Sequence, residues 1–315
     1  MTTKSKKATK KSSARKTKAS KKRSAAPKKR SEAPRKRSAQ AAMAVAMSPK
    51  RTVAQRVSAL IEAPLASCAS DENLQSMLQM LRDQKQPIKV RLAALQSLQA
   101  ASFSVITFEP CRADYLATLR EVIEDPDEEL RQRALGILAR ENDGYAQKRL
   151  LEGLENKDKA LVSPEKALQL LSYDVHAEAY PIARKIVEQP PNDEAKREAL
   201  RLLAADASSA PLFEKILRDK DEKRDIRQIS AAALQAVEPE RFREQARELV
   251  LDDKEYDDIQ ATALTALASL PHAADVAEDK PLLRHISNMG KAKSAKIKKG
   301  ARRFLNRYGK SDDAD

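Results

Sequence analysis

Residues 124–138 read EDPDEELRQRALGIL, and this stretch contains a complete turn between two helices. Pro126 ends the first helix, because proline lacks the N–H group that a helix interior needs for its hydrogen bonds. The acidic residues 127–129 suit the start of the next helix, where free N–H groups and the helix dipole favour negative charge. From Leu130 onward, apolar residues recur at helical spacing and form one stripe. The stretch therefore predicts two helices joined by a tight turn.

The second helix of this stretch recurs along the chain. Its pattern is an apolar residue, often a basic residue next, then an Ala-Leu pair and another apolar residue three positions later. Segments such as DYLATLREVIED (114–125) lie between the copies and carry one apolar stripe each. A single stripe cannot be buried alone, so we expect helix pairs that stack into an array with a continuous core. The alanines of the Ala-Leu pairs, spaced by 40, 33, 32, 34 and 30 residues, are Ala94, Ala134, Ala167, Ala199, Ala233 and Ala263.

Residues 124–138 resemble the turn and second helix of a HEAT-type repeat, and the similarity covers roughly residues 71–270. The resemblance implies an all-α fold, a right-handed, armadillo-like α-solenoid of about six helix pairs. In that family, an aspartate of the turn and a basic residue of the second helix form a ladder between neighbouring units. We expect the ladder here to include Arg91, Asp125 with Arg131, and Asp221 or Asp225 with Arg227. Other residues interrupt it at the basic position in three units: Pro164, Ser230 and Gln260.

Charge divides the chain into three parts. Residues 1–51 hold 19 Lys and Arg against one acid, residues 52–289 hold 32 basic and 42 acidic residues, and residues 290–310 hold nine basic residues and no acid. We predict a basic arm (1–51), a repeat solenoid (52–289) and a C-terminal part (290–315) with a basic capping helix and a short acidic tail. The arm has few large apolar residues, so we expect it to be disordered. Such asymmetry indicates polyanion binding by the two ends.

The arm contains KKRSAAPKKRSEAPRKRSA (21–39), in which a basic cluster and a serine recur every seven residues. It resembles the Lys/Ala/Pro tails of linker histones, which implies contact with a nucleic-acid backbone. Each Lys or Arg that neutralises a phosphate releases counterions and gives affinity without sequence specificity. The predicted nucleic-acid contacts are Lys21, Lys22, Arg23, Lys28, Lys29, Arg30, Arg35, Lys36, Arg37, Lys50, Arg51, Lys299, Arg302 and Arg303. Phosphorylation would subtract charge at the neighbouring serines Ser24, Ser31, Ser38 and Ser48. A nuclear-import or other targeting signal, an anionic-membrane contact and a solubilising tail stay open as alternatives.

Basic residues also recur on the second helices, which line the concave surface in the resembled family. A groove for a nucleic-acid backbone needs such a stripe. However, residues 52–289 carry an excess of acid and the chain has no Trp, which favours structural ion pairs or a solvated face. The residues concerned are Lys89, Arg91, Arg131, Arg133, Lys166, Lys196, Arg197, Arg201, Arg224 and Arg227.

No motif for catalysis, a metal or a cofactor is recognisable. The histidines His176, His272 and His285 are isolated, and Cys68 and Cys111 form no CxxC pattern. The six glycines build no phosphate-binding loop. No apolar run approaches the ~18 residues of a membrane span. We therefore expect a protein that is not an enzyme and has no cofactor, metal or small-molecule substrate.

These observations lead to one main hypothesis and two alternatives. The main hypothesis is a scaffold or adaptor that binds a protein partner on its solenoid surface and holds nucleic acid, DNA rather than RNA, through its arm. One alternative is a HEAT-like glycosylase that acts on DNA bases, since the resembled family includes such repair enzymes. The other is a pure protein-interaction or assembly scaffold whose arm is a targeting signal. The expected location is the cytoplasm, at the nucleoid or chromatin, or the nucleus in a eukaryote.

Overall fold

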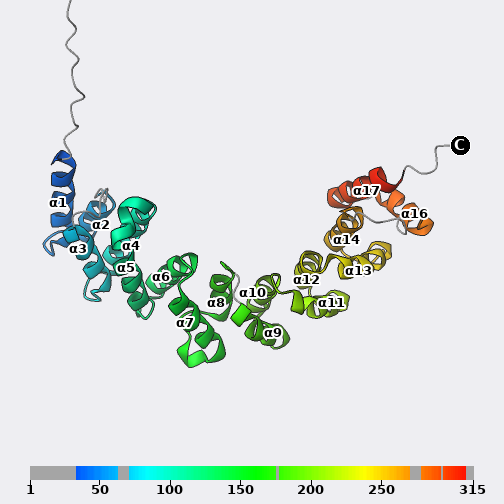
Figure 1. The fold of residues 1–315 in the computed structure, drawn as a ribbon, viewed down its shortest axis with the longest axis horizontal. Helices are drawn as coiled ribbons and strands as arrows, with labels where there is room; N and C mark the ends of the chain where they lie inside the picture. Colours follow the sequence, from blue (N-terminus) through cyan, green and yellow to red (C-terminus); the bar gives the residue numbers. More distant parts are fainter. Residues whose placement is uncertain (1–32, 63–70, 175–176, 270–277, 292–293, 310–315) are drawn as a thin grey trace, which may run out of the picture.

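The structure is a computed structural model that describes residues 33–62, 71–174, 177–269, 278–291 and 294–309. These residues form sixteen α-helices and three short 3-10 helices and contain no strand (Figure 1). The predicted all-α fold is confirmed. The α-helices are α1 (Ala33–Met47), α2 (Val53–Glu62), α3 (Asp71–Arg82), α4 (Ile88–Ser102), α5 (Val105–Val122), α6 (Glu128–Arg140), α7 (Gly144–Glu155), α8 (Pro164–Leu171), α9 (Tyr180–Glu188), α10 (Asp193–Leu203), α11 (Ala210–Arg218), α12 (Arg224–Val237), α13 (Pro239–Leu251), α14 (Asp257–Ser269), α16 (Lys280–Met289) and α17 (Ala295–Tyr308). The 3-10 helices are η1 (Lys157–Lys159), η2 (Ala177–Ala179) and η3 (Ala207–Ser209).

The helices stack as antiparallel pairs along a curved array, and the array has an inner and an outer row. Figure 1 shows α4, α6, α8, α10, α12, α14 and α17 along the inside of the arc, and their preceding partners along the outside. Within the inner row, α10 contacts α8 and α12, and α14 contacts α12 and α17. The six pairs expected over roughly residues 71–270 run from α3/α4 to α13/α14, and the described residues add one pair at each end.

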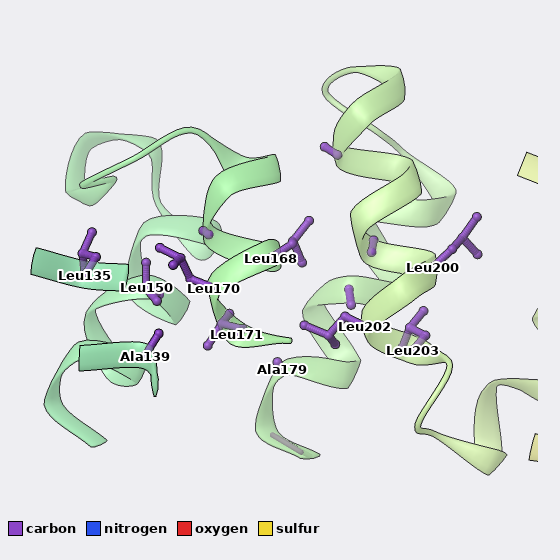
Figure 2. Packing of buried hydrophobic residues seen from close by; sticks show 14 of the residues in the cluster. Leu135, Ala139, Leu150, Leu168, Leu170, Leu171, Ala179, Leu200, Leu202 and Leu203 are labelled. Atoms are coloured by element: carbon purple, nitrogen blue, oxygen red, sulfur yellow. The ribbon is translucent and has the colours of Figure 1, made fainter. Parts of the chain in front are cut away.

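One continuous hydrophobic core runs through the array. It contains the leucines and alanines that the repeat pattern singled out, and Figure 2 shows part of it, where α6, α7, α8 and α10 meet. The small residues of the pattern let neighbouring helices approach closely, as at Gly300 of α17. An added Cβ at Gly300 would lie 3.1 Å from the Leu264 Cβ of α14. All six alanines of the Ala-Leu pairs are buried: Ala94, Ala134, Ala167, Ala199, Ala233 and Ala263.

The prediction of a disordered arm through residue 51 is wrong for residues 33–47, which form α1. Met43 and Ala46 are buried where α1 packs on α2, and Arg56 Nε donates a hydrogen bond to the Ala46 carbonyl at 2.6 Å. The apolar run AAMAVAM at 41–47 is sufficient for one buried face, because α2 supplies the other half of the pair. Residues 1–32 and the predicted acidic tail at 311–315 lie outside the described residues.

Candidate nucleic-acid interface

A buried polar side chain joins several inner helices to the outer helix before them. Arg56, Arg91 and Arg227 each donate from Nε to a carbonyl ten residues earlier in the chain. Gln260 reaches the Val250 carbonyl in the same way, at 3.5 Å. These carbonyls belong to the last turn of the outer helix, where no intrahelical donor is left for them. The side chains at this recurring position therefore cap the C-terminal end of the outer helix and hold the two helices of a pair together.

The same arginines connect neighbouring units, but with partners that differ from the predicted ones. Arg91 Nη1 lies 3.2 Å from Asp125 Oδ1 of the next unit, and Arg227 Nη1 lies 2.8 Å from Glu255 Oε1. The predicted pairing of Asp125 with Arg131 is wrong, because Arg131 donates to the backbone carbonyls of Asp125 and Leu161. Asp221 and Asp225 likewise do not pair with Arg227, and Asp225 accepts from Arg197 instead. Each of these arginines points forward along the array: Arg91 and Arg227 reach an acid in the turn of the following unit, and Arg56 reaches Gln86 there.

Both acids of the ladder are held in the ionised form. Burial alone would raise the pKa of Asp125, but hydrogen bonds from Arg91 and from the Asp127 amide outweigh burial and lower it. Burial acts in the same direction on Glu255, and the hydrogen bonds from Arg227 and Lys220 again lower the pKa. The ladder is thus a structural element, and its buried arginines are not accessible to a ligand.

The other basic residues predicted on the inner helices are mostly compensated by carboxylates. Ion pairs join Arg133 to Glu129, Arg197 to Asp225 and Arg224 to Asp258, at 2.6, 2.7 and 3.0 Å. Lys196 pairs with Glu222, and Arg201 pairs with Glu198. Lys89 and Lys166 have no carboxylate partner among the described residues, and Lys166 Nζ donates to Gln169. The middle of the concave face therefore does not present a stripe of free positive charge.

Helix α17 differs from this pattern. It carries six basic residues and no acid, and none of the six forms an ion pair within the described part of the chain. Ile297, Ala301 and Phe304 form its buried face. The cations lie outside this face: Lys296, Lys299, Arg302, Arg303 and Arg307 are exposed, and Lys298 is half-buried. Arg307 Nη1 also donates to the Ala268 carbonyl at 2.8 Å. An apolar inner face would suffice to cap the solenoid, so capping does not explain the uniform charge of the outer face.

Three of these cations line a groove of about 450 Å³ between α17, α14 and α12. Lys296, Lys299 and Arg303 stand at positions i, i+3 and i+7, a stripe about 10 Å long at 1.5 Å per residue. The opposite wall is polar. Gln228 Nε2 donates to Thr262 Oγ1 at 3.2 Å, while Gln228 Oε1 is buried and has no hydrogen-bond partner in the described residues. The same wall includes the Asp258 carboxylate, which is paired with Arg224, and the Thr262 hydroxyl donates to the Asp258 carbonyl. The three cations are therefore the groups of this groove that would attract phosphate oxygens.

The preceding helix, α16, extends the basic surface. Lys280, Arg284 and His285 line a separate cavity of about 420 Å³, and neither Lys280 nor Arg284 forms an ion pair in the part of the chain that is described. His285 Nε2 lies 3.8 Å from Asp253 Oδ1. The other two histidines, His176 and His272, lie outside the described residues. Among those that are described, no three His, Cys, Asp or Glu side chains come together as a metal site.

Those predicted nucleic-acid residues that the structure describes lie at the two ends of the arc and are not brought together. Lys299, Arg302 and Arg303 are exposed on α17, and Lys50 and Arg51 are exposed in the turn between α1 and α2. Arg35, Lys36, Arg37 and Ser38 belong to α1, and the half-buried Ser48 follows it. The remaining predicted residues lie outside the described part of the chain: Lys21, Lys22, Arg23, Ser24, Lys28, Lys29, Arg30 and Ser31.

A different groove, mainly apolar, lies on the inner face near the N-terminal end. Its volume is about 530 Å³, and its walls are Val53, Val57 and Ile61 of α2 and Leu92 and Ala93 of α4. Val53 and Ile61 remain 37 % and 56 % exposed. The rim carries the cations Lys89 and Arg133. No helix among the described residues is long and apolar enough to cross a membrane.

Comparison with known proteins yields no family and no sequence relative. No protein-family model matches the chain, and no curated protein matches it. Among solved structures, a crystal structure of an engineered protein matches with a TM-score of 0.46 and 17 % identity over 86 % of this chain and 78 % of the other. The structure of human deoxyhypusine hydroxylase in complex with glycerol matches with a TM-score of 0.34 and 15 % identity, over 78 % of this chain and 99 % of the other.

The second match corrects one expectation from the sequence. Deoxyhypusine hydroxylase is an enzyme, so the prediction that the present chain is not an enzyme is contradicted, and we do not retain it. At these identities and TM-scores, neither match assigns an activity, a substrate or a partner to this chain. The comparisons therefore leave the chain as an all-helical array of stacked pairs, and its function has to be argued from its own side chains.

Proposed function

We propose that this protein is a solenoid scaffold or adaptor that holds nucleic acid, DNA rather than RNA, through its basic ends and offers its surface to a protein partner. The observation that carries the proposal is the contrast between α17 and the rest of the array. Cations of the inner helices are mostly paired with carboxylates, whereas the six cations of α17 are unpaired within the described residues. The basic arm and the exposed Lys50 and Arg51 make the opposite end similarly basic.

Uncompensated lysines and arginines favour the phosphate backbone over the bases. A cation already paired with a carboxylate has less to gain from a phosphate, because the existing ion pair must first be broken. The cations of α17 have no such carboxylate partner. Each phosphate contact therefore adds the free energy of counterion release without first breaking an ion pair. No aromatic side chain lines the groove at Lys296, Lys299 and Arg303, so stacking of single-stranded bases has no platform there. These features support sequence-independent binding of duplex DNA.

The protein partner would bind at another part of the surface, the groove between α2 and α4. The groove between α2 and α4 has an apolar floor, with Val53 and Ile61 incompletely covered. Grooves of this kind bind one face of an amphipathic helix, and the basic rim at Lys89 would favour an acidic flank on that helix. The expected location, at the nucleoid or chromatin, follows from the DNA part of the proposal and is tested with it.

The test is binding to a random-sequence duplex, measured by fluorescence anisotropy with the full-length chain. One variant lacks residues 2–32 and keeps α1, since α1 belongs to the fold. A second variant replaces three cations of the groove, Lys296→Gln, Lys299→Gln and Arg303→Gln. The proposal predicts that each single variant retains binding and that the combination of both changes lowers affinity by about a hundredfold or more at 0.1 M salt. Unchanged affinity of the combined variant, or no binding by the full-length chain, would overturn the proposal.

A further inference from the structure

We infer that the partner of the groove between α2 and α4 is a second copy of this chain, whose exposed turn between α4 and α5 enters the groove. The inference rests on the proposed function and names the partner for its protein-binding surface. It follows from an apolar surface that the fold leaves uncovered, from the chemistry of the groove, and from the free charge that each of the two surfaces carries.

The turn between α4 and α5 carries the most exposed large apolar side chains of the described residues. Phe103, Val105 and Ile106, here called the apolar turn, are 78 %, 62 % and 91 % exposed. The corresponding turn after α6, residues 141–143, is polar throughout, so the stacking of helices does not require apolar residues at this place. Adjacent exposed side chains of this size mark an interaction surface.

The start of α5 separates a buried face from an exposed one. Phe108 is buried in the core and packs edge to face on Tyr115, with ring centroids 5.4 Å apart. Glu109 lies on the exposed face, about one helical turn after Ile106, and forms no ion pair within the described residues. The exposed face is therefore apolar at its tip and carries one free acid a turn further along.

The groove between α2 and α4 offers the complement to this face. Val57 and Leu92 line it, and Val53 and Ile61 leave 37 % and 56 % of their surface exposed. Lys89 stands on its rim without a carboxylate partner among the described residues, while the second rim cation is already in an ion pair. An apolar floor with one free cation fits an apolar helix face with one free acid, and such a charge pair fixes the direction of docking.

The groove has a defined direction and length. Ser97 Oγ of α4 donates to the Leu60 carbonyl of α2 at 2.8 Å, so Ile61 lies near the Gln96 end of the groove. Lys89 lies at the other end, seven residues earlier on α4, a distance of about 10 Å at 1.5 Å per residue. The free cation and the exposed Ile61 are thus at opposite ends.

The start of α5 matches this arrangement in one orientation. Phe103 and Glu109 are six residues apart, which corresponds to about 9 Å in a helix. If α5 of a second copy runs antiparallel to α4 in the groove, its apolar turn lies on Ile61 and its Glu109 lies at Lys89. The turn cannot enter the groove of its own chain, because α5 packs in the outer row and the groove faces the inside of the arc (Figure 1).

The contact joins two different surfaces, so it is heterologous. Each added copy leaves a free apolar turn at one end and a free groove at the other, and association continues beyond a dimer as the concentration rises. One helix start buries far less than the about 1,600 Å² of a stable interface. We therefore expect weak association, with a dissociation constant of about 10–100 μM.

Sedimentation equilibrium of the full-length chain, freed of nucleic acid, measures this association between about 1 and 200 μM. One variant disables the apolar turn, Phe103→Ser with Ile106→Asp, and the other disables the groove, Val53→Asp with Ile61→Ser. All four side chains are exposed, so both variants should fold, which thermal unfolding checks. The wild type should rise from the 35.0 kDa of one chain to more than twice that mass, and each variant should associate about tenfold or more weakly.

The mixture of the two variants is the decisive sample. One brings an intact groove and the other an intact apolar turn, so an equimolar mixture should associate with wild-type affinity and stop at a dimer. As a control, Tyr145→Asp adds the same charge at a side chain of α7 that is 46 % exposed, and it should leave association within about twofold.

An exchange of charges tests the orientation. Glu109→Lys and Lys89→Glu should each weaken association about threefold or more at low salt, and the chain that carries both changes should regain it, since the pair re-forms with its signs reversed. If the double variant associates no better than the single ones, this orientation is wrong.

The outcomes keep the inference and the proposed function apart. A chain that keeps the mass of one copy up to about 200 μM, or a mixture that does not associate, overturns the inference and leaves DNA binding in place. Equal loss of association in Tyr145→Asp also overturns it, because the contact is then unspecific. If the full-length chain does not bind duplex DNA, the DNA part of the proposed function fails, while self-association stands on its own measurement.

Discussion

Arg227 is the residue on which the ladder can be tested most sharply. The residue is 1 % exposed, and its guanidinium joins the Leu217 carbonyl to Glu255 of the next unit. Replacement by Ala leaves Glu255 buried without this partner, although Lys220 Nζ stays 2.5 Å from the carboxylate. We expect Arg227→Ala to lower the free energy of unfolding by about 3 kcal/mol in urea denaturation followed by circular dichroism.

The exposed pair of Arg133 with Glu129 provides the control for this measurement. Both side chains are about half exposed and stand four residues apart on α6. Arg133→Ala should therefore cost less than about 1 kcal/mol. If the two substitutions cost the same, the ladder does not stabilise the array in the way described here.

Asp125 gives the ladder a pH dependence of predictable sign. Its pKa is lowered in the folded chain, so the unfolded chain binds a proton more readily at mildly acidic pH. The contribution to stability is complete above the unfolded value of 3.8 and is lost as pH falls through the lower, folded pKa. The melting temperature of the wild type should therefore fall as the pH is lowered below about 4. Asp125→Asn should reduce this acid sensitivity and lower stability at neutral pH; an unchanged acid profile would contradict the assignment.

At the scale of single residues, the sequence indicated ion pairs between neighbouring units, but the structure gives some of the predicted residues other partners. Arg91, Asp125 and Arg227 all take part, and Arg131 holds backbone carbonyls. Spacing along the chain shows that an arginine stands on the second helix, but not which neighbouring unit its side chain faces. That direction depends on how the pairs stack, and it became clear only from the three-dimensional arrangement.

Gly300 decides how closely the last helix approaches the array. A Cβ at this position would lie 3.1 Å from the Leu264 Cβ and 3.3 Å from its Cδ1. Gly300→Val adds two methyl groups beyond that contact, so we expect α17 to be displaced from α14 at a cost of about 1–3 kcal/mol. Thermal unfolding measures this cost. In the chain without residues 2–32, the same variant should also weaken DNA binding, although every cation is still present.

Gly136 on α6 is the matched position for this test. A Cβ there would meet nothing within 4 Å, so Gly136→Ala should be tolerated and add up to about 1 kcal/mol through helix propensity. Equal melting temperatures for the Gly300→Val variant and the wild type would contradict the tight packing of α17 against α14.

At the scale of helices, the Ala-Leu pattern located the central pairs and missed the first one. Helix α1 lies in a segment rich in Lys, Ser and Ala, and only its last two turns carry an apolar face. The signal that was overlooked is Arg56, which stands ten residues after Ala46 as Arg91 stands ten after Leu81. The groove beneath α17 could not be predicted, because Gln228 and Thr262 face Lys299 only through the packing of three helices.

For the whole molecule, the sequence predicted the all-α array and the two basic ends, because helical periodicity and net charge can both be read along the chain. The concave stripe of basic residues was a weaker prediction, and most of its members lie in ion pairs between adjacent units. Composition alone does not distinguish a compensated cation from a free one. The distinction between the middle of the array and its C-terminal end therefore required the structure.

The salt dependence of binding tests whether α17 contributes to DNA contact as a discrete set of charges. In the chain without residues 2–32, the groove cations Lys296, Lys299 and Arg303 act without competition from the arm. A duplex of about 12 base pairs, about 40 Å long, is long enough to cover the stripe of about 10 Å that these three cations form. The slope of log K against log salt changes by about 0.9 for each phosphate contact. Replacing the three cations by Gln should thus make the slope shallower by about 2.7 between about 50 and 200 mM salt, measured by anisotropy.

The control variant replaces three exposed lysines of the outer row by Gln: Lys148, Lys185 and Lys215. It should leave the slope unchanged, since those side chains lie away from the groove. An equal change of slope in both variants would mean that net charge alone, rather than the surface of α17, governs the binding.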